Sequence, residues 1–203
     1  MSTLLVVAKE PVPGRVKTRL TPPFSPGEAA RLACAALTDT LAAVAATPAD
    51  RRVLVLDGAP GAWLPDGLDL EVLPQAAGGL DERLADAFSQ VAGPALLIGM
   101  DTPQVTPRLL ARGLALARGG AALGPAADGG FWALGLAAPD PSLVRGVPMS
   151  TSGTGDAQLR RLVLAGLVVG ELPTLRDVDT AADAFAVAAT APTTHFAHAL
   201  TRA

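Results

Sequence analysis

The sequence predicts a single α/β domain built around one largely parallel sheet. Apolar runs of strand length alternate along the chain with amphipathic stretches of about 10–18 residues, which is the pattern of strand–helix–strand units. One run, residues 95–99, is apolar without interruption, as is typical of a central strand that is buried on both faces. The chain has 203 residues, enough to bury one substantial core, and no repeat or low-complexity linker divides it.

The expected elements follow one another in a regular order. Ser25, Pro26 and Glu28 mark a helix start, with a capping hydroxyl, a proline at the first helical position and a capping-box carboxylate; they predict a helix to about residue 46. Strands are expected at residues 4–8, 52–56, 70–73, 95–99, 121–124, 131–136 and 167–172. Further helices are expected at residues 80–91, 107–117 and 154–165, from residue 181 onward, and in the tail after residue 192.

Composition and charge exclude several classes of protein. Half of the residues are hydrophobic and 17% are charged, which argues against disorder, and the net charge of −3 gives no general affinity for nucleic acid or an anionic membrane. The single cysteine, Cys34, excludes a disulfide framework and a cysteine-rich zinc site, and it is expected to be a small core residue. No secretory signal and no membrane-spanning run are visible, so a cytoplasmic enzyme or binding protein is expected.

The loop after the first expected strand concentrates positive charge. Its sequence, residues 9–20, is K-E-P-V-P-G-R-V-K-T-R-L. The two prolines stiffen the loop and Gly14 allows a sharp turn, so that four cations project from one compact segment. Such a loop can hold a polyphosphate, although a solvated basic turn is the alternative. It lacks the glycine spacing of a P-loop and of a Rossmann dinucleotide fingerprint.

Acidic residues follow the later strands. Asp101 comes directly after the central strand, at the sheet edge where α/β proteins bind ligands, and a carboxylate there suits Mg²⁺ or Mn²⁺. The alternative is an ordinary Asx turn. Asp177 and Asp179 can hold one cation from the same side of an extended segment, or Asp179 can simply cap the helix that begins at Ala181.

Two further loops have ligand-binding composition. In Asp128-Gly129-Gly130 the glycines keep side chains out of a ligand's path, although a plain hairpin turn would explain them as well. Residues 149–155 are rich in small hydroxyl side chains and glycine, which suits contact with a sugar or phosphate or, alternatively, a flexible loop. The only histidines, His195 and His198, are expected on the surface of the terminal helix, so a Ser-His-Asp hydrolase is poorly supported.

Six segments in the same order resemble a bacterial family of small glycosyltransferase-like proteins, described as selenodomain-associated or radical-SAM-associated and formerly a domain of unknown function. They are K-E-P-V-P-G-R-V-K-T-R-L (9–20), D-E-R-L (81–84), I-G-M-D-T-P (98–103), G-P-A-A-D-G-G-F-W-A-L-G-L (124–136), M-S-T (149–151) and D-V-D-T (177–180). The chain departs from the family pattern at Phe131, where tyrosine is usual, at Met149, where tryptophan is usual, and around Gly79 and Asp81.

The resemblance implies a three-layer α/β/α domain with a mostly parallel sheet, similar to the GT-A or nucleotide-diphospho-sugar transferase fold, over residues 1–203. It also implies that Asp101 and Asp179 bind Mg²⁺ or Mn²⁺ and that Asp101 and Asp128 are the catalytic carboxylates. The expected nucleotide or phosphate contacts are Ala8, Lys9, Pro13, Gly14, Arg15, Lys17, Arg19 and Arg83. The expected contacts to the sugar or acceptor are Asp128, Gly129, Gly130, Ser150 and Thr151.

Three functions are compatible with these residues. The first is a metal-dependent glycosyltransferase that uses a nucleoside diphosphate sugar and a small-molecule acceptor. The second is a nucleotidylyltransferase of the guanylyltransferase type, in which the same loop holds a nucleoside triphosphate. The third is a non-catalytic nucleotide-binding protein that keeps the fold.

Overall fold

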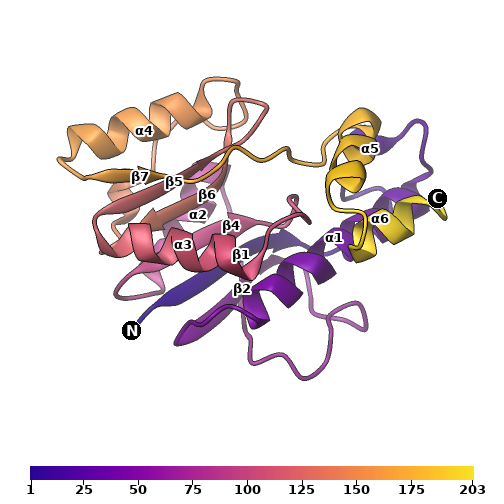
Figure 1. The fold of residues 1–203 in the computed structure, drawn as a ribbon, viewed down its shortest axis with the longest axis horizontal. Helices are drawn as coiled ribbons and strands as arrows, with labels where there is room; N and C mark the ends of the chain where they lie inside the picture. Colours follow the sequence, from indigo (N-terminus) through magenta and orange to yellow (C-terminus); the bar gives the residue numbers. More distant parts are fainter.

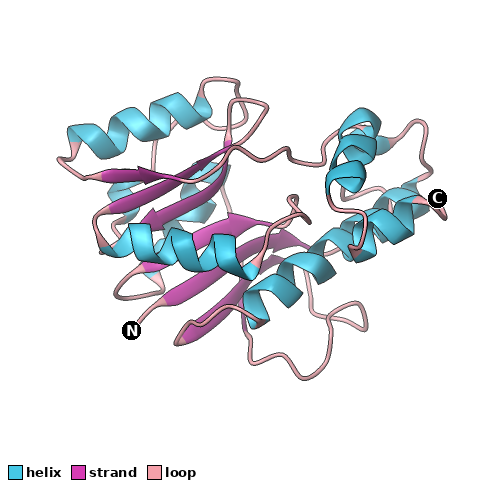
Figure 2. Cartoon of the chain, viewed as in Figure 1, coloured by secondary structure: helices cyan, strands magenta, loops and turns pink.

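The computed structural model describes all 203 residues, from Met1 to Ala203. One seven-stranded sheet, in the order β3-β2-β1-β4-β6-β5-β7, forms the centre of the molecule, with helices on both faces (Figures 1 and 2). The fold is therefore the expected α/β class with a mostly parallel sheet. None of the helices combines the length and the apolar character that crossing a membrane requires.

The observed elements lie close to those expected from the sequence. The strands are β1 (Thr3–Lys9), β2 (Arg51–Asp57), β3 (Glu71–Pro74), β4 (Ala95–Gly99), β5 (Ala121–Pro125), β6 (Phe131–Leu136) and β7 (Val169–Glu171). The α-helices are α1 (Pro26–Ala45), α2 (Leu80–Ser89), α3 (Pro107–Arg118), α4 (Thr154–Leu164), α5 (Ala181–Thr190) and α6 (His195–Leu200). Short 3-10 helices, η1 and η2, cover Thr18–Leu20 and Pro141–Leu143.

The sheet is parallel except at β6. Strand β1 pairs in parallel with both β2 and β4, β2 pairs with β3, and β5 pairs with β7. Strand β6 runs antiparallel between β4 and β5. Because β6 begins at the edge where β4 and β5 end, the loop that joins β5 to β6 lies at the carboxyl edge of the parallel strands.

The alternating side chains of the strands build a core on each face. Leu4 and Val6 of β1 point toward α1 and α3, whereas Leu5 of the same strand packs with α2 and α4. Figure 1 shows α1 and α3 in front of the sheet and α2 and α4 on its other side, which gives the expected three layers. This alternation is the period-two pattern of a strand that is covered on both faces.

The C-terminal helices form an arm beside the sheet. The chain crosses from β7 through an extended segment to α5 and α6, which lie against the N-terminal part of α1 (Figure 1). A third apolar cluster unites Leu20 and Phe24 of the first loop with Val178 and Phe196 of this arm. The first loop and the Asp177–Asp179 segment, far apart in sequence, are therefore held together.

Two local expectations were wrong. Asp179 does not cap α5, because the N-cap residue is Thr180. The Thr180 hydroxyl accepts a hydrogen bond from the Asp183 amide, and the Asp183 carboxylate accepts one from the Thr180 amide. Cys34 is half-buried on α1 and is not among the buried core residues, although it lies one helical turn from Ala30 and Leu37, which pack against the sheet. Burial raises the pKa of the Cys34 thiol, which is therefore not activated as a nucleophile.

Candidate functional site

A cleft of about 600 Å³ opens at the carboxyl edge of the sheet. One wall is the first loop together with the ends of β1 and β3, and the floor is the end of β4. The opposite wall consists of the β5–β6 loop, the loop before α4 and the extended segment before α5. The cleft therefore lies at the position where open α/β sheets bind ligands, and it brings together six separate parts of the chain.

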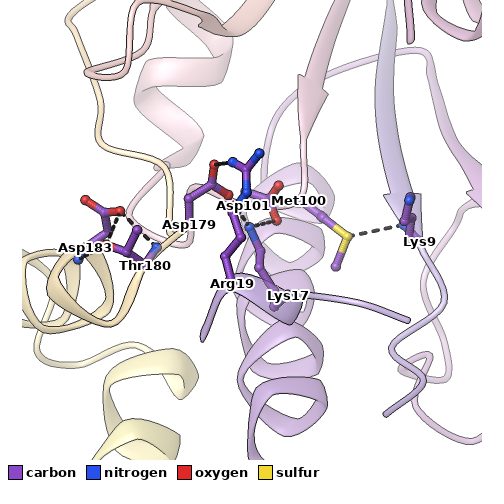
Figure 3. Close-up of polar contacts among 8 residues, drawn as sticks. All are labelled: Lys9, Lys17, Arg19, Met100, Asp101, Asp179, Thr180 and Asp183. Carbon is purple, nitrogen blue, oxygen red and sulfur yellow. Dashed lines mark hydrogen bonds and ion pairs between the residues drawn. The ribbon is translucent and has the colours of Figure 1, made fainter. Parts of the chain in front are cut away.

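Lys17 lies at the centre of the cleft. Its backbone has φ 50° and ψ 39°, a left-handed conformation that is uncommon for a residue with a side chain. The ammonium points inward, only 8% of the side chain is exposed, and Nζ lies 2.8 Å from Asp101 Oδ1 and 3.1 Å from Asp179 Oδ1 (Figure 3). The 2.8 Å contact is an ion pair rather than a well-directed hydrogen bond. Burial lowers the pKa of Lys17, but attraction to Asp101 and Asp179 outweighs it, so the net shift is upward.

The two carboxylates that hold Lys17 come from segments far apart in the sequence, one at the middle of the chain and one near its C-terminal end. Asp101 follows β4, and the backbone amide of Val178 donates to the Asp101 carbonyl at 2.9 Å, which fixes the extended segment against the end of the strand. Asp179 also accepts from Arg19 at 3.3 Å, but the Arg19 side chain is 74% exposed. Such an exposed pair is screened by water and contributes little to stability.

Asp177 is the most perturbed acid of the molecule. Burial and the negative charges of Asp101 and Asp128 raise its pKa from 3.8 to about 7. Its Oδ1 atom is buried and has no hydrogen-bond partner. A carboxylate in these surroundings needs a proton or a cation beside it, because an unpaired buried charge is costly.

On the β2–β3 side, Gln75 organises a second polar group. Its amide donates to the carbonyls of Ala8 (3.0 Å) and Val55 (3.1 Å), and its Oε1 accepts from Arg83 at 2.8 Å. Asp57 lies 3.9 Å from both Lys9 and Arg83. Of the five cations that line the cleft, only Arg15 has no acidic partner, so its guanidinium is available to an anionic ligand.

The opposite wall is made of two interlocked loops. The Gly155 amide donates to the Gly129 carbonyl at 2.8 Å, and Asp128 accepts from the Gly130 amide at 2.8 Å in an Asx turn. Thr154 donates to the Pro148 carbonyl at 2.9 Å and accepts from the Thr151 amide at 3.1 Å. These bonds hold the hydroxyl side chains of residues 150–154 beside Asp128, with no cation among them.

Most residues expected at the site line this cleft. They are Ala8, Lys9, Arg15, Lys17, Arg19, Arg83, Asp101, Asp128, Gly130, Ser150, Thr151 and Asp179. Three expected residues do not line the cleft. Pro13 and Gly14 lie elsewhere in the first loop, and Gly129 faces the Ser152 carbonyl. The β5–β6 loop is a hairpin connection, and it also lines the cleft, so its contact with a ligand stays a prediction.

Gln75 was missed at the sequence level, although a signal for it existed. It is the first residue after the short strand β3, much as Asp101 is the second residue after β4. The expectation that ligand residues follow parallel strands would have selected it as well. Met149 and Phe131, the two departures from the family pattern, also line the cleft.

The acidic residues suit a divalent cation, but they form an incomplete ligand set. No group of three or more His, Cys, Asp or Glu side chains is arranged to hold a metal ion. The available donors are hard carboxylate oxygens, among them the buried and unpartnered Asp177 Oδ1. Mg²⁺ is commonly bound in this way, by one or two carboxylates, with water and substrate phosphates as the remaining ligands. The residues therefore fit a magnesium-like ion that binds together with a phosphorylated ligand.

Comparison with solved structures gives matches over nearly the whole chain. A protein from Desulfovibrio desulfuricans G20, provisionally described as a nucleotide-diphospho-sugar transferase, is 26% identical with a TM-score of 0.88, covering 99% of this chain and 94% of that one. A nucleotidyl transferase from Methanothermobacter thermautotrophicus is 17% identical, with a TM-score of 0.60 and 99% of each chain covered. The 2-C-methyl-D-erythritol 4-phosphate cytidylyltransferase from Thermus thermophilus is 19% identical, with a TM-score of 0.57 and coverage of 95% and 100%. The last two likenesses concern the fold alone.

The sequence comparisons identify the family. A search of curated proteins finds no significant match. Residues 40–151, more than half of the chain, match the profile of a bacterial family described as uncharacterized proteins conserved in bacteria (DUF2064). With the sheet topology and the cleft in place, the chain belongs to the DUF2064 family and has the fold of the nucleotide-diphospho-sugar transferases.

Proposed function

We propose that this protein is a metal-dependent transferase that binds a nucleoside diphosphate sugar and transfers the sugar to a small acceptor. The observation that carries this proposal is the convergence of five cations and four carboxylates on one cleft at the carboxyl edge of the sheet. The likeness to the Desulfovibrio protein, which extends over nearly the full length of both chains, supports the same class.

The first loop would hold the diphosphate. Arg15 lacks an acidic partner, and Arg19 is exposed enough to turn from Asp179 toward a ligand. Fixed cations beside a diphosphate stabilise the charge that develops as it leaves the sugar. Because Lys17 and Arg19 also belong to this loop, the leaving group would meet positive charge from several directions.

A divalent ion would be held by Asp101 and Asp179, the two carboxylates that contact Lys17. When bound, Mg²⁺ or Mn²⁺ would neutralise the phosphate oxygens of the departing diphosphate. The chain's own contribution is to fix these carboxylates at the end of β4, through the hydrogen bond from the Val178 amide to the Asp101 carbonyl.

The acceptor would lie against the interlocked loops. Asp128 uses one carboxylate oxygen for the Gly130 amide, which leaves the other free to accept a hydrogen bond from an acceptor hydroxyl. Ser150 and Thr151 stand beside it as further hydrogen-bonding groups, and Phe131 and Met149 supply apolar contact. The acceptor oxygen would form a bond to the sugar carbon and give its proton to the free Asp128 oxygen as the carbon–oxygen bond to the diphosphate breaks.

Arg15→Ala tests the phosphate role of the first loop. We expect nucleoside diphosphates to bind the wild-type protein and to raise its melting temperature, and the substitution to weaken their binding by about 1–3 kcal/mol. Titration calorimetry measures the change. Arg160→Ala is the matched control, since Arg160 is an exposed arginine on α4 that makes no ion pair and does not line the cleft. Equal affinity of both variants would refute the phosphate role.

Product analysis separates the transferase proposal from its rivals. Release of a nucleoside diphosphate from a sugar nucleotide supports glycosyl transfer. Release of pyrophosphate from a nucleoside triphosphate would assign nucleotidyl transfer instead. Tight nucleotide binding without turnover of either donor would identify a binding protein that keeps the fold.

A further inference from the structure

Lys17 holds the two carboxylates that the proposed metal ion would need. Its ammonium lies 2.8 Å from Asp101 and 3.1 Å from Asp179, so it bridges a residue after β4 to a residue before α5 (Figure 3). The side chain is only 8% exposed, which means that little water screens the contact. In this conformation the protein supplies its own cation to the acidic centre of the cleft.

The backbone at Lys17 is also unusual. With φ 50° it adopts the left-handed region, although neither a glycine nor an asparagine stands there. Such conformations persist where the surrounding structure enforces them, and they are concentrated at binding sites and switch regions. The ion pairs with Asp101 and Asp179 are the contacts that hold the side chain inward from this backbone position.

An ammonium and a divalent ion cannot share these carboxylates in their present arrangement. Both are cations that would be drawn to the same two carboxylates, and positive charges at such short range in a shielded cleft repel each other strongly. A ligand that binds only a minor conformation has its apparent affinity reduced by the population of that conformation. Metal binding therefore requires Lys17 to leave.

We infer that Lys17 is a built-in counter-cation which the metal ion must displace, so that metal binding is weak until a diphosphate is present to receive the ammonium. This inference rests on the metal site of the proposed function and goes beyond it by assigning Lys17 a second role. The incomplete set of protein ligands points the same way, because phosphate oxygens would complete the metal site and pair with the displaced ammonium.

The arrangement has a thermodynamic consequence. Binding of either ligand favours the conformation in which Lys17 has left Asp101 and Asp179, so the second ligand no longer has to break these ion pairs. Metal and diphosphate therefore increase each other's affinity, and by the same factor. Without Lys17 there is nothing to displace. The metal ion should then bind well by itself, and diphosphate should add less to its affinity.

Equilibrium dialysis of Mn²⁺ against the wild-type protein and Lys17→Met measures the first consequence, with no nucleotide present. Methionine keeps an unbranched stem and removes the charge. We expect Lys17→Met to bind Mn²⁺ about 5- to 150-fold more tightly than wild type, the usual range of coupling between two ligands. Arg19→Met is the matched control: Arg19 also contacts Asp179 but is 74% exposed, so its loss should change Mn²⁺ affinity much less.

The same dialysis with inorganic pyrophosphate in both compartments measures the coupling. Chelation of Mn²⁺ by free pyrophosphate is equal for both proteins, so their difference isolates the protein-bound metal. Pyrophosphate should increase Mn²⁺ binding more for wild type than for Lys17→Met. Wild type that binds Mn²⁺ alone as tightly as Lys17→Met would overturn the inference and leave the transferase proposal standing. No Mn²⁺ binding by either protein, even with pyrophosphate, would overturn the metal site on which the inference rests.

A measurement on the wild-type protein covers the case in which Lys17→Met does not fold, which circular dichroism would reveal. The ¹⁵N resonance of the Lys17 ammonium reports its pairing with Asp101 and Asp179. We expect Mg²⁺ alone to leave this resonance in place, and Mg²⁺ with pyrophosphate to shift it. A resonance that stays unchanged while both ligands bind would overturn the displacement of Lys17.

Discussion

Asp177 shows how much the surroundings of one residue can change its chemistry. Its pKa rises from 3.8 to about 7 because it is buried and because Asp101 and Asp128 are negative neighbours. A group whose folded-state pKa is raised retains protons that the unfolded chain has already released. As pH rises from 3.8 to about 7, the unfolded chain ionises this carboxyl while the folded protein keeps it protonated. The free energy of unfolding therefore falls over this pH range.

The substitution Asp177→Asn removes this dependence. At pH 8, in the presence of a chelator, we expect the free energy of unfolding to rise by about 2–4 kcal/mol relative to wild type, because a buried charge is replaced by a neutral amide. At about pH 3.5, below the unfolded-state pKa, the two proteins should differ little. Urea unfolding at both pH values measures the difference.

Asp183→Asn provides the contrasting control. Its hydrogen bonds to Thr180 and Arg176 outweigh burial and lower the pKa of Asp183. Its contribution to stability is present above pH 3.8 and is lost as pH falls through the lower folded-state pKa. Removing the carboxylate should therefore destabilise the protein at pH 8, the opposite sign to Asp177→Asn. Equal stability of wild type and Asp177→Asn at both pH values would show that Asp177 is not perturbed.

At the scale of elements, the acceptor wall depends on the fit between the β5–β6 loop and the loop before α4. Gly129 has φ +90°, a conformation that favours glycine, and a Cβ at this position would overlap the Ser152 carbonyl. Gly155 approaches the Gly130 carbonyl so closely that a Cβ there would lie 2.7 Å from it. The two loops can therefore meet only because glycines stand at the contact.

Gly129→Ala should separate these loops. We expect a loss of stability on the order of 1–3 kcal/mol from backbone strain, and a lower turnover because Asp128 and Ser150 no longer face the acceptor together. Nucleotide binding, which depends on the opposite wall, should be retained. Kinetics with a sugar nucleotide and calorimetry with its nucleoside diphosphate measure the two properties separately.

Gly153→Ala is the matched control, because Gly153 lies in the loop before α4 with φ −106°, and a Cβ added there would come no closer to its surroundings than 4.0 Å, the distance to Thr151 Oγ1. It should have nearly wild-type turnover and stability. A similar loss of turnover in both variants would attribute the effect to loop flexibility rather than to the Gly129–Ser152 contact.

The elements themselves were largely predictable, because each depends on local pattern. The apolar run of β4 and the capping box of Ser25 and Glu28 define their elements without tertiary information. The insertion of β6 between β4 and β5 was not predictable, since strand pairing is decided by contacts between distant segments. The pairing of Lys17 with Asp101 and Asp179 was unpredictable for the same reason. The positions of these residues after expected strands indicated one edge of the sheet, but only the tertiary structure decides which cation contacts which carboxylate.

At the scale of the whole molecule, the C-terminal arm joins the two halves of the charged centre. Leu20 and Phe24 follow Lys17 and Arg19 in the first loop, and Val178 lies between Asp177 and Asp179. All three are buried in one cluster with Phe196 of α6. Packing against the arm therefore fixes the first loop and the acidic segment relative to each other, although neither α5 nor α6 lines the cleft.

Phe196→Ala tests whether packing of the C-terminal arm positions the first loop and the acidic segment. Phe196 is 1% exposed, and truncation of a buried phenylalanine typically costs about 3–5 kcal/mol of unfolding free energy. Because the cavity would lie in the cluster shared by the first loop and the acidic segment, we also expect weaker nucleoside diphosphate binding, even at temperatures where the variant is fully folded.

Phe185→Ala is the matched control: Phe185 is 58% exposed and contacts Phe24 at a ring separation of 6.3 Å, so its loss should cost about 1 kcal/mol or less. Urea unfolding and calorimetry on both variants decide the outcome. If Phe196→Ala loses stability but binds the nucleotide as tightly as wild type, the arm stabilises the fold without positioning the charged centre.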